Sequence, residues 1–235
     1  AAWRDFTFNA MSMTPDGALY DPFHGKKDLI DGRVRFVGEA SQRVREDVLR
    51  ILRWFRFYAH YGKPPLDESA LSACKGFAFR LPDLSGERVR HELLRLLDAP
   101  NPLPSIELMI ETNVMDAVLG RGRSAQGLTR LRGIEDANFA SPDPVLRLAA
   151  LIGTHGAVAP LSTRLRLSNN ERDRLDQALA ADEAFITAAS IYVLPVGRID
   201  DTEIGDGGVG PVTASLRSAY LELARAEFPK VPETA

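Results

Sequence analysis

The fold of this chain follows from one stretch, Arg43-Val44-Arg45-Glu46-Asp47-Val48-Leu49-Arg50-Ile51-Leu52-Arg53-Trp54-Phe55-Arg56-Phe57-Tyr58-Ala59-His60-Tyr61. Its apolar residues recur at steps of three and four, which predicts one α-helix with a buried stripe. The stripe consists of Val44, Val48, Ile51, Leu52, Phe55, Tyr58 and Ala59. A second stripe is charged: Glu46 and Asp47 precede Arg50 by four and three positions, so we expect these three side chains to meet on one face of the helix.

The charged stripe has two interpretations. The simpler one is a solvated row of ion pairs, each contributing about 0.2–0.5 kcal/mol. The other is a fixed acceptor and donor that face a flat polar ligand, because the carboxylate of Asp47 only accepts hydrogen bonds and the guanidinium of Arg50 only donates them. Such a pair matches the edge of cytosine or adenine, where an amine lies beside an acceptor. It would reject uracil and guanine, which place a carbonyl oxygen where that amine would be.

The order Glu46-Asp47-Val48-Leu49-Arg50-Ile51-Leu52-Arg53 resembles the EDxxRxxR motif of the bacterial-type (class II) tRNA nucleotidyltransferase and poly(A) polymerase family. Members of this family, the CCA-adding enzymes among them, extend the 3′ end of RNA without a nucleic-acid template. The resemblance implies that Asp47 and Arg50 act as a protein template for CTP or ATP. It further implies that Glu46 steadies Arg50 and that Arg53 belongs to the same nucleotide site.

A second resemblance lies at the start of the chain, where Arg4-Asp5-Phe6-Thr7-Phe8-Asn9-Ala10 is similar to the family's RRDFTxNA motif. This implies that Arg4, Asp5 and Asn9 contact the triphosphate and ribose. Trp3 stands where the family usually has the first Arg, which implies weaker binding of phosphates. The segment from Asp21 to Leu29 resembles DPFGGxxDL, a flexible connection in the family.

Downstream, Leu84-Ser85-Gly86-Glu87-Arg88 with Glu92-Leu93 resembles the family's LSxERxxxEL motif, which supports the template helix. Glu87 and Arg88 either hydrogen-bond to that helix or are ordinary charges of a first helical turn. The stretch from Leu161 to Arg172 resembles the family's RLrLSnxER segment.

In this family, Mg²⁺ is held by an Asp-x-Asp pair upstream of the RRD motif. This chain begins after that position, so we expect the Mg²⁺ ligands in a missing N-terminal part. We accordingly assign no catalytic residue and no metal ligand to this chain, and we expect it to be inactive alone.

These patterns predict a mainly α fold in which a helical neck and body follow a small β-hairpin or strand remnant of a nucleotidyltransferase head. We expect head residues 1–42, a neck with the template helix at residues 43–100, a helical body at residues 101–180 and a tail at residues 181–235. The hairpin turns at Pro15-Asp16-Gly17, with flanking strands around residues 6–13 and 18–20, and another short strand covers residues 33–37. Helices are expected at residues 67–74, 85–97, 105–119, 128–139, 144–152, 162–180 and 216–228. Residues 185–193 show no helical face, and we expect residues to be missing there.

Composition limits the possible functions of the chain. Its 235 residues are 45% hydrophobic and 26% charged with a net charge of −3, which is ordinary for a globular protein. One cysteine, Cys74, excludes an internal disulfide, and no apolar run approaches the about 20 residues of a membrane span. We expect a cytoplasmic protein with CTP, ATP and the tRNA 3′ end as partners and without a membrane; no pattern indicates an oligomeric state.

Three alternatives to CCA addition remain open from the sequence. CC-adding, A-adding and poly(A)-adding relatives share these motifs. A non-catalytic helical RNA-binding module would keep the neck and body. A helical protein with fortuitous ion pairs is the least informative reading.

Overall fold

The computed structural model describes residues 4–137, 140–153, 157–180, 184–188, 191–196, 198–199, 202–203 and 209–227. The chain divides into two compact units. The first unit holds residues 1–125 and 159–168, and the second holds residues 126–158 and 169–235. Trp3, and with it the expected effect of its substitution, lies outside the described residues.

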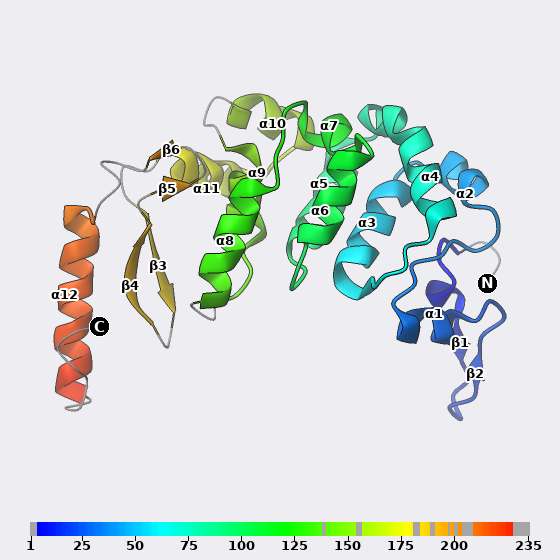
Figure 1. Ribbon diagram of the computed structural model, residues 1–235, viewed down its shortest axis with the longest axis horizontal. Coiled ribbons are helices and arrows are strands. Elements are labelled where there is room, and N and C mark those ends of the chain that lie inside the picture. The colour runs from blue at the N-terminus through cyan, green and yellow to red at the C-terminus, as the bar shows by residue number, and fades with distance from the viewer. Residues whose placement is uncertain are drawn as a thin grey trace. The chain divides into compact units, whose positions relative to one another are not determined.

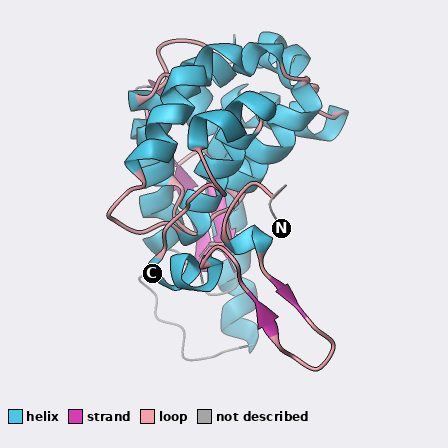
Figure 2. Ribbon diagram, turned by 90° about the vertical axis from the view of Figure 1, so that its right-hand side faces the viewer, coloured by secondary structure: helices cyan, strands magenta, loops and turns pink. Residues whose placement is uncertain are grey.

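The first unit begins with short elements: a 3₁₀ turn η1 (Phe8–Ala10), the strands β1 (Ser12–Met13) and β2 (Leu19–Tyr20), and the helix α1 (Gly25–Asp31). The two strands pair antiparallel, which confirms the predicted hairpin, and it projects from the helices in Figure 2. Of the strand predicted at residues 6–13, the structure forms only β1 at its end. The strand predicted at residues 33–37 is wrong, because Phe36 forms only an isolated bridge, with Phe6.

The segment expected as a loop at residues 21–29 contains α1. The carboxylate of Asp21 accepts hydrogen bonds from the backbone N–H groups of Gly25 (2.7 Å) and Lys26 (2.9 Å), and thereby caps the start of this helix. Gly25 also allows close packing, since a Cβ there would lie 2.3 Å from the carbonyl oxygen of Thr7. The capping carboxylate and the glycine together explain why a turn-rich sequence becomes helical.

The single helix predicted from Arg43 to Tyr61 is also wrong. The structure has two helices, α2 (Ala40–Glu46) and α3 (Arg50–Tyr61), and Asp47 between them is extended (φ −149°, ψ 108°). The Asp47 carboxylate accepts a hydrogen bond from the backbone N–H of Leu49 (3.1 Å). This local bond competes with the helical hydrogen bonds, as aspartate side chains commonly do, and restarts the helix at a new angle.

The apolar stripe of this stretch is nevertheless buried from Val44 to Phe55, and its last members, Tyr58 and Ala59, are half-buried. α3 packs against α5 (Gly86–Leu97) and α6 (Leu103–Glu111), while α2 packs against α4 (Glu68–Phe77). Trp54 is fully buried, and its indole N–H donates to the carbonyl oxygen of Val34 (2.8 Å). The remaining elements of the unit are η2 (Ala78–Asp83), α7 (Val114–Leu119) and, apart from Val158, α10 (Val158–Leu165).

Helix boundaries in this unit follow local chemistry. Asp67 caps α4 as expected, since its side chain accepts from the N–H of Ala70 (3.0 Å). The helix expected at residues 105–119 is two helices, because Asn113 adopts the left-handed conformation (φ 60°) between α6 and α7. Asparagine tolerates this conformation better than most residues, so a helix can end there.

The second unit contains α8 (Gln126–Ala137), α9 (Pro144–Ile152), α11 (Asn169–Ala180) and α12 (Pro211–Glu227). α9 packs between α8 and α11 (Figure 1). Its bounds are those predicted, residues 144–152. Pro144 occupies the first turn, and Gly153 ends the helix in the left-handed conformation (φ 68°). The cap was not predicted: Asp143 accepts hydrogen bonds from the N–H groups of Val145 and Leu146. The helix expected at residues 162–180 is divided between α10 and α11.

The strands β3 (Ala184–Ala188) and β4 (Ile191–Val196) pair antiparallel, and the sequence did not lead us to expect them. The short strands β5 (Arg198–Ile199) and β6 (Thr202–Glu203) also pair. The prediction that residues are missing near here stays a prediction. A mainly α fold with a small N-terminal hairpin is confirmed, and the four-part domain division stays a prediction.

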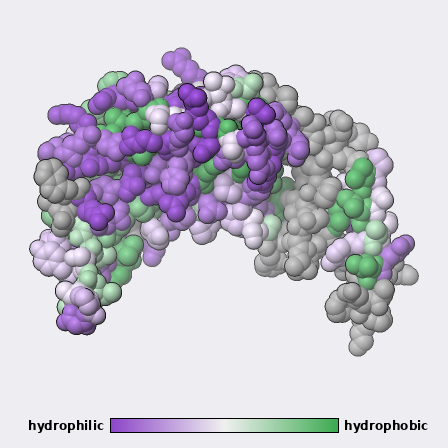
Figure 3. Space-filling view, turned by 180° about the vertical axis from the view of Figure 1, so that it is seen from behind, coloured by the Kyte–Doolittle hydropathy of each residue, from purple (hydrophilic) through white to green (hydrophobic). Residues whose placement is uncertain are grey.

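The surface over the helices of the first unit is mainly hydrophilic in the view of Figure 3. Along the parts of the chain that the structure describes, no helix combines the length and the apolar character needed to cross a membrane.

Candidate nucleotide site

Asp5 is the centre of the first cluster of predicted site residues. One carboxylate oxygen, Oδ1, accepts from the side-chain amide of Asn9 (2.9 Å) and from the backbone N–H of Phe6 (3.0 Å). The other, Oδ2, accepts from Nε of Arg53 at 2.5 Å. The structure therefore brings together three residues of two separate motifs, of which two lie 48 positions apart in the sequence.

Arg4, the neighbour of Asp5, does not join this cluster. Its side chain is exposed, and among the described residues no group accepts a hydrogen bond from it. Its predicted role in binding phosphate stays a prediction.

Arg50 belongs to a second cluster at the junction of α2 and α3. Its Nη1 donates to Oε2 of Glu46 (2.7 Å) and to the carbonyl oxygen of Arg43 (2.9 Å). Nη1 of Arg43 donates to the same Glu46 oxygen (2.9 Å). The Glu46–Arg50 contact expected from the spacing is present, and Arg43 is an additional member that the motif did not identify.

Asp47 does not share a helix face with Arg50, contrary to the prediction. Its carboxylate instead accepts from Nη2 of Arg88, which lies on α5, at 3.0 and 2.9 Å. Of the two readings of Arg88, a hydrogen bond to the template segment is thus the observed one. The side chains of Asp47 and Arg88 are 36% and 48% exposed, so a ligand can reach this pair.

Glu92 links the first cluster to α5. Its Oε1 lies 3.7 Å from Nη1 of Arg53, and its Oε2 lies 3.2 Å from Nη1 of Arg56. Glu92 and Arg56 are both buried, and neither was assigned to the site from the sequence. Glu92 follows Arg88 by four positions, so a search for one-turn spacing on the helix of the LSxERxxxEL motif could have identified it.

The electrostatics of the clusters favour ionised carboxylates. Burial raises the pKa of Asp5, but hydrogen bonds from Asn9, Arg53 and the Phe6 N–H outweigh it and hold that pKa below its ordinary value. The hydrogen bond from Arg50, helped by Arg43, lowers the pKa of Glu46. Both groups are thus acceptors that stay charged at neutral pH.

The residues of the first unit do not fit the Mg²⁺ that the family implies. Within the ranges that the structure describes, no three His, Cys, Asp or Glu side chains are grouped so that they could hold a metal ion. The carboxylates of Asp5, Glu46 and Asp47 are each held by arginine. We therefore derive no catalytic step through a metal from this chain.

The fold and the two clusters define a class of protein: a mainly α module with an arginine–carboxylate cluster where α2 and α3 meet, linked to α5 by the pair of Asp47 and Arg88. A family model described as the poly A polymerase head domain matches residues 1–35. Another, described as the probable RNA and SrmB-binding site of polymerase A, matches residues 65–121.

Among curated proteins, the chain is 37% identical over 174 residues to the mitochondrial CCA tRNA nucleotidyltransferase 1 of Danio rerio, covering 72% of this chain and 40% of that protein. It is 38% identical over 141 residues to the CCA-adding enzyme of Streptococcus pneumoniae serotype 19F (strain G54), covering 60% and 35%. The chain thus spans less than half the length of these relatives.

Solved structures resemble it as well. The Bacillus stearothermophilus CCA-adding enzyme in complex with CTP is 29% identical with a TM-score of 0.63, covering 76% of this chain and 46% of that one. The Thermotoga maritima CCA-adding enzyme complexed with tRNA is 26% identical with a TM-score of 0.59, covering 74% and 46%. The chain belongs to the class II tRNA nucleotidyltransferase and poly(A) polymerase family.

Proposed function

We propose that this chain serves in the template-independent addition of CCA to the 3′ end of tRNA, with CTP and ATP as substrates. The relatives named as CCA-adding enzymes and the structures titled as complexes with CTP and tRNA support this proposal. Mg²⁺ is the expected cofactor, and the cytoplasm is the expected compartment.

The observation that carries the proposal is that the α2–α3 junction holds the donors of Arg50 and the acceptor of Asp47. Arg50 uses Nη1 for Glu46 and the Arg43 carbonyl, while its Nε and Nη2 groups have no acceptor among the described residues. These groups can donate to a ring nitrogen or carbonyl oxygen of a base.

Asp47 supplies the complementary acceptor. A carboxylate offers about four lone-pair positions. The Leu49 N–H and Nη2 of Arg88 leave capacity for the amine of cytosine or adenine. Because Asp47 lies in the break between helices, the pair acts through two adjoining segments and not through one helix face. We retain Asp47 and Arg50 as the base-selecting pair on this corrected geometry.

The other proposed nucleotide contacts are Arg4, Asp5, Asn9, Glu46 and Arg53. In this proposal Glu46 fixes the position of Arg50. Asp5, Arg53 and Asn9, which are hydrogen-bonded to one another through Asp5, form the surface that contacts the sugar and the phosphates. Contacts to phosphate and sugar do not distinguish one base from another, so their loss weakens the binding of all nucleotides alike.

The test uses the complete gene product with labelled tRNA lacking its CCA end, Mg²⁺ and each nucleotide singly and together. The expected product gains C, C and A in that order and incorporates neither U nor G. A long A tail would instead identify a poly(A)-adding enzyme, and tRNA binding without incorporation would favour a binding module.

A further inference from the structure

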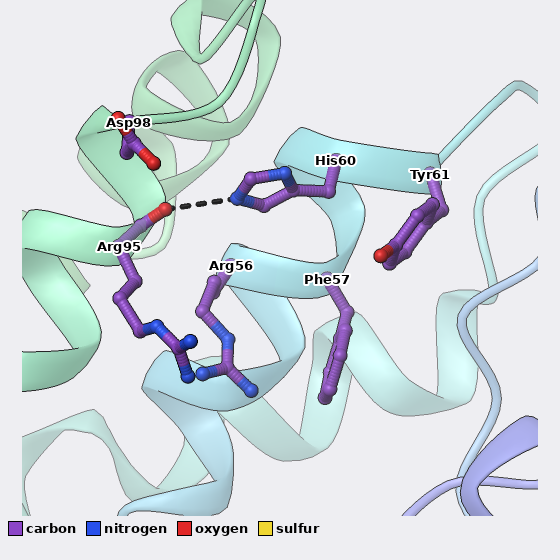
Figure 4. Close-up of a pocket in the computed structure, with 6 residues that line it drawn as sticks. All are labelled: Arg56, Phe57, His60, Tyr61, Arg95 and Asp98. Atoms are coloured by element: carbon purple, nitrogen blue, oxygen red, sulfur yellow. Dashed lines mark hydrogen bonds between the residues drawn. The ribbon is translucent and has the colours of Figure 1, made fainter.

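A pocket lies in the first unit next to the Asp5–Arg53 cluster, where the last turns of α3 face the end of α5. It encloses about 330 Å³ and is lined by Arg56, Phe57, His60, Tyr61, Arg95 and Asp98 (Figure 4). Of these six residues, Arg56 also contacts the first cluster, through its ion pair with Glu92, and the other five do not belong to the clusters described above. The pocket combines cationic and aromatic side chains, a combination typical of surfaces that bind single-stranded nucleic acid.

The two guanidinium groups of this pocket lie side by side in Figure 4. Arg56 has a carboxylate partner in Glu92, at 3.2 Å. Arg95 is exposed, and among the described residues no group accepts a hydrogen bond from its guanidinium. Asp98 sits at the opposite end of the pocket in Figure 4 and forms no ion pair with Arg95 there.

Positive charge is crowded around Arg56. Burial lowers the pKa of Arg56 most, and the neighbouring charges of Arg53 and Arg95 lower it further, whereas the carboxylates of Glu92 and Asp5 raise it. Like charges held this close are stabilised by an anion placed between them. Guanidinium groups bind phosphate oxygens through paired N–H donors, so phosphate suits the geometry.

Tyr61 provides the second half of the site. Its ring is 49% exposed and stacks on Phe57 with ring centroids 6.3 Å apart. Phe57 is in turn held by Arg56, whose guanidinium carbon lies 4.4 Å from the ring centroid. The exposed ring is therefore a fixed platform for a nucleobase next to the arginines.

The backbone of the pocket is fixed as well. Nε2 of His60 donates to the carbonyl oxygen of Arg95 (2.9 Å), which ties the end of α3 to α5. The two arginines thus come from segments that are held together before any ligand binds.

We propose that this pocket binds one phosphodiester group of the RNA strand, with the adjoining base against Tyr61. The proposal rests on the proposed function for the presence of RNA. A phosphodiester carries a single negative charge, which matches the one guanidinium without a carboxylate partner. The triphosphate of CTP or ATP carries several charges and would need more cations than the pocket supplies.

The test measures binding of tRNA lacking its CCA end to the 235-residue chain over a range of salt concentrations, by fluorescence anisotropy. Arg95→Gln should weaken binding about tenfold at low salt. It should also reduce the slope of log K against log[salt] by about 0.7–0.9, which is the loss of one phosphate contact. Lys75→Gln removes an exposed cation of α4 outside the pocket and should leave the slope unchanged.

A second pair of variants tests the platform. Tyr61→Ala should weaken RNA binding about tenfold at every salt concentration, whereas Tyr61→Phe keeps the ring and should bind normally. CTP affinity, measured separately by calorimetry, should be the same in the original chain and in Arg95→Gln.

The outcomes separate the inference from the function on which it rests. If the original chain binds no RNA, the result contradicts both the proposed function and the assignment of the pocket. If it binds RNA and Arg95→Gln keeps the full slope, the pocket assignment is wrong while the proposed function stands. If Arg95→Gln loses CTP affinity along with RNA affinity, the pocket serves the nucleotide and the assignment to RNA is overturned.

Discussion

Arginine–carboxylate pairs occur in both units of the molecule, and they differ in exposure. In the second unit, Arg147 is fully buried and donates to Glu135 at 2.6 Å, where Glu135 is only 4% exposed. In the first unit, Arg88 and Asp47 are paired at 2.9 Å, yet their side chains are 48% and 36% exposed. The two pairs have similar residue types and distances, but a ligand can reach only the pair of Arg88 and Asp47.

The difference separates bracing from binding. Burying the pair removes water from both Arg147 and Glu135, and no ligand can reach either side chain from solvent. The role left to this pair is to hold α8 and α9 together. The exposed pair contributes little to stability and can share its hydrogen-bonding capacity with a ligand. The comparison predicts that substitutions in the buried Arg147–Glu135 pair change the free energy of unfolding, whereas those in the exposed Asp47–Arg88 pair mainly change recognition.

The largest effect is expected from Arg147→Met. It leaves the buried Glu135 carboxylate with Arg132, 3.3 Å away, as its one remaining ion-pair partner in the part of the chain that the structure describes. We expect the free energy of unfolding to fall by about 3 kcal/mol, at the low end for a broken buried pair because Arg132 remains. Urea denaturation followed by circular dichroism measures this change.

The control for this substitution is the double variant Arg147→Met with Glu135→Leu. Removing both charges eliminates the uncompensated carboxylate, so most of the lost stability should return. If the double variant is as unstable as the single one, the pair does not act through buried charge.

A smaller, pH-dependent effect is expected for Asp5, which combines burial with a position in the proposed site. Asp5→Asn should lower the free energy of unfolding at pH 7 by about 1.5–3 kcal/mol, because hydrogen bonds to a charged acceptor are lost. The pKa of Asp5 is lowered from 3.8 in the folded chain. The stabilisation is therefore complete above that value and is lost as the pH falls through the lower, folded pKa.

The measurement is the free energy of unfolding of both forms between about pH 7 and pH 2. The difference between them should shrink below about pH 4. Glu107→Gln on the exposed side of α6 serves as the matched control and should show no such difference. A difference that stays constant to the lowest pH would contradict an ionised, hydrogen-bonded Asp5.

The smallest effect on stability is expected from Arg88→Ala. The exposed pair with Asp47 should contribute less than about 1 kcal/mol, and a double-mutant cycle with Asp47→Ala measures that coupling directly. The coupling should diminish as salt is added. A coupling as large as that of Arg147 with Glu135 would remove the distinction between bracing and binding pairs.

Much of the fold could be predicted because helix signals in this sequence are local. The structure contains the helices predicted at residues 67–74 and 144–152, and Asp67, Pro144 and Gly153, which set their ends, each act within one turn. The break at Asp47 could not be predicted from periodicity, since the apolar stripe continues through it. The hairpin of β3 and β4 was missed because its pairing joins two segments, although its β-branched residues and lack of a helical face were a usable signal.

The site was predictable only where motifs supplied it. Spacing indicated the Glu46–Arg50 contact, and the resemblance brought Asp5, Asn9 and Arg53 into one set. The contacts of Asp5 with Arg53 and of Asp47 with Arg88 span 48 and 41 positions. Such contacts depend on how the N-terminal segment and α5 pack on α3, which no local pattern specifies. For this reason Glu92 and Arg56 were overlooked.

The central claim is that Asp47 and Arg50 select the base, and the most direct test is the ratio of kcat/KM for CTP over UTP in the complete gene product. Asp47→Asn keeps the shape of the side chain but replaces one acceptor oxygen by a donor. We predict that this ratio falls by about 10- to 100-fold, equivalent to one hydrogen bond to a charged group, while the stability of the fold changes little. An unchanged ratio in Asp47→Asn and in Arg50→Ala would contradict the account.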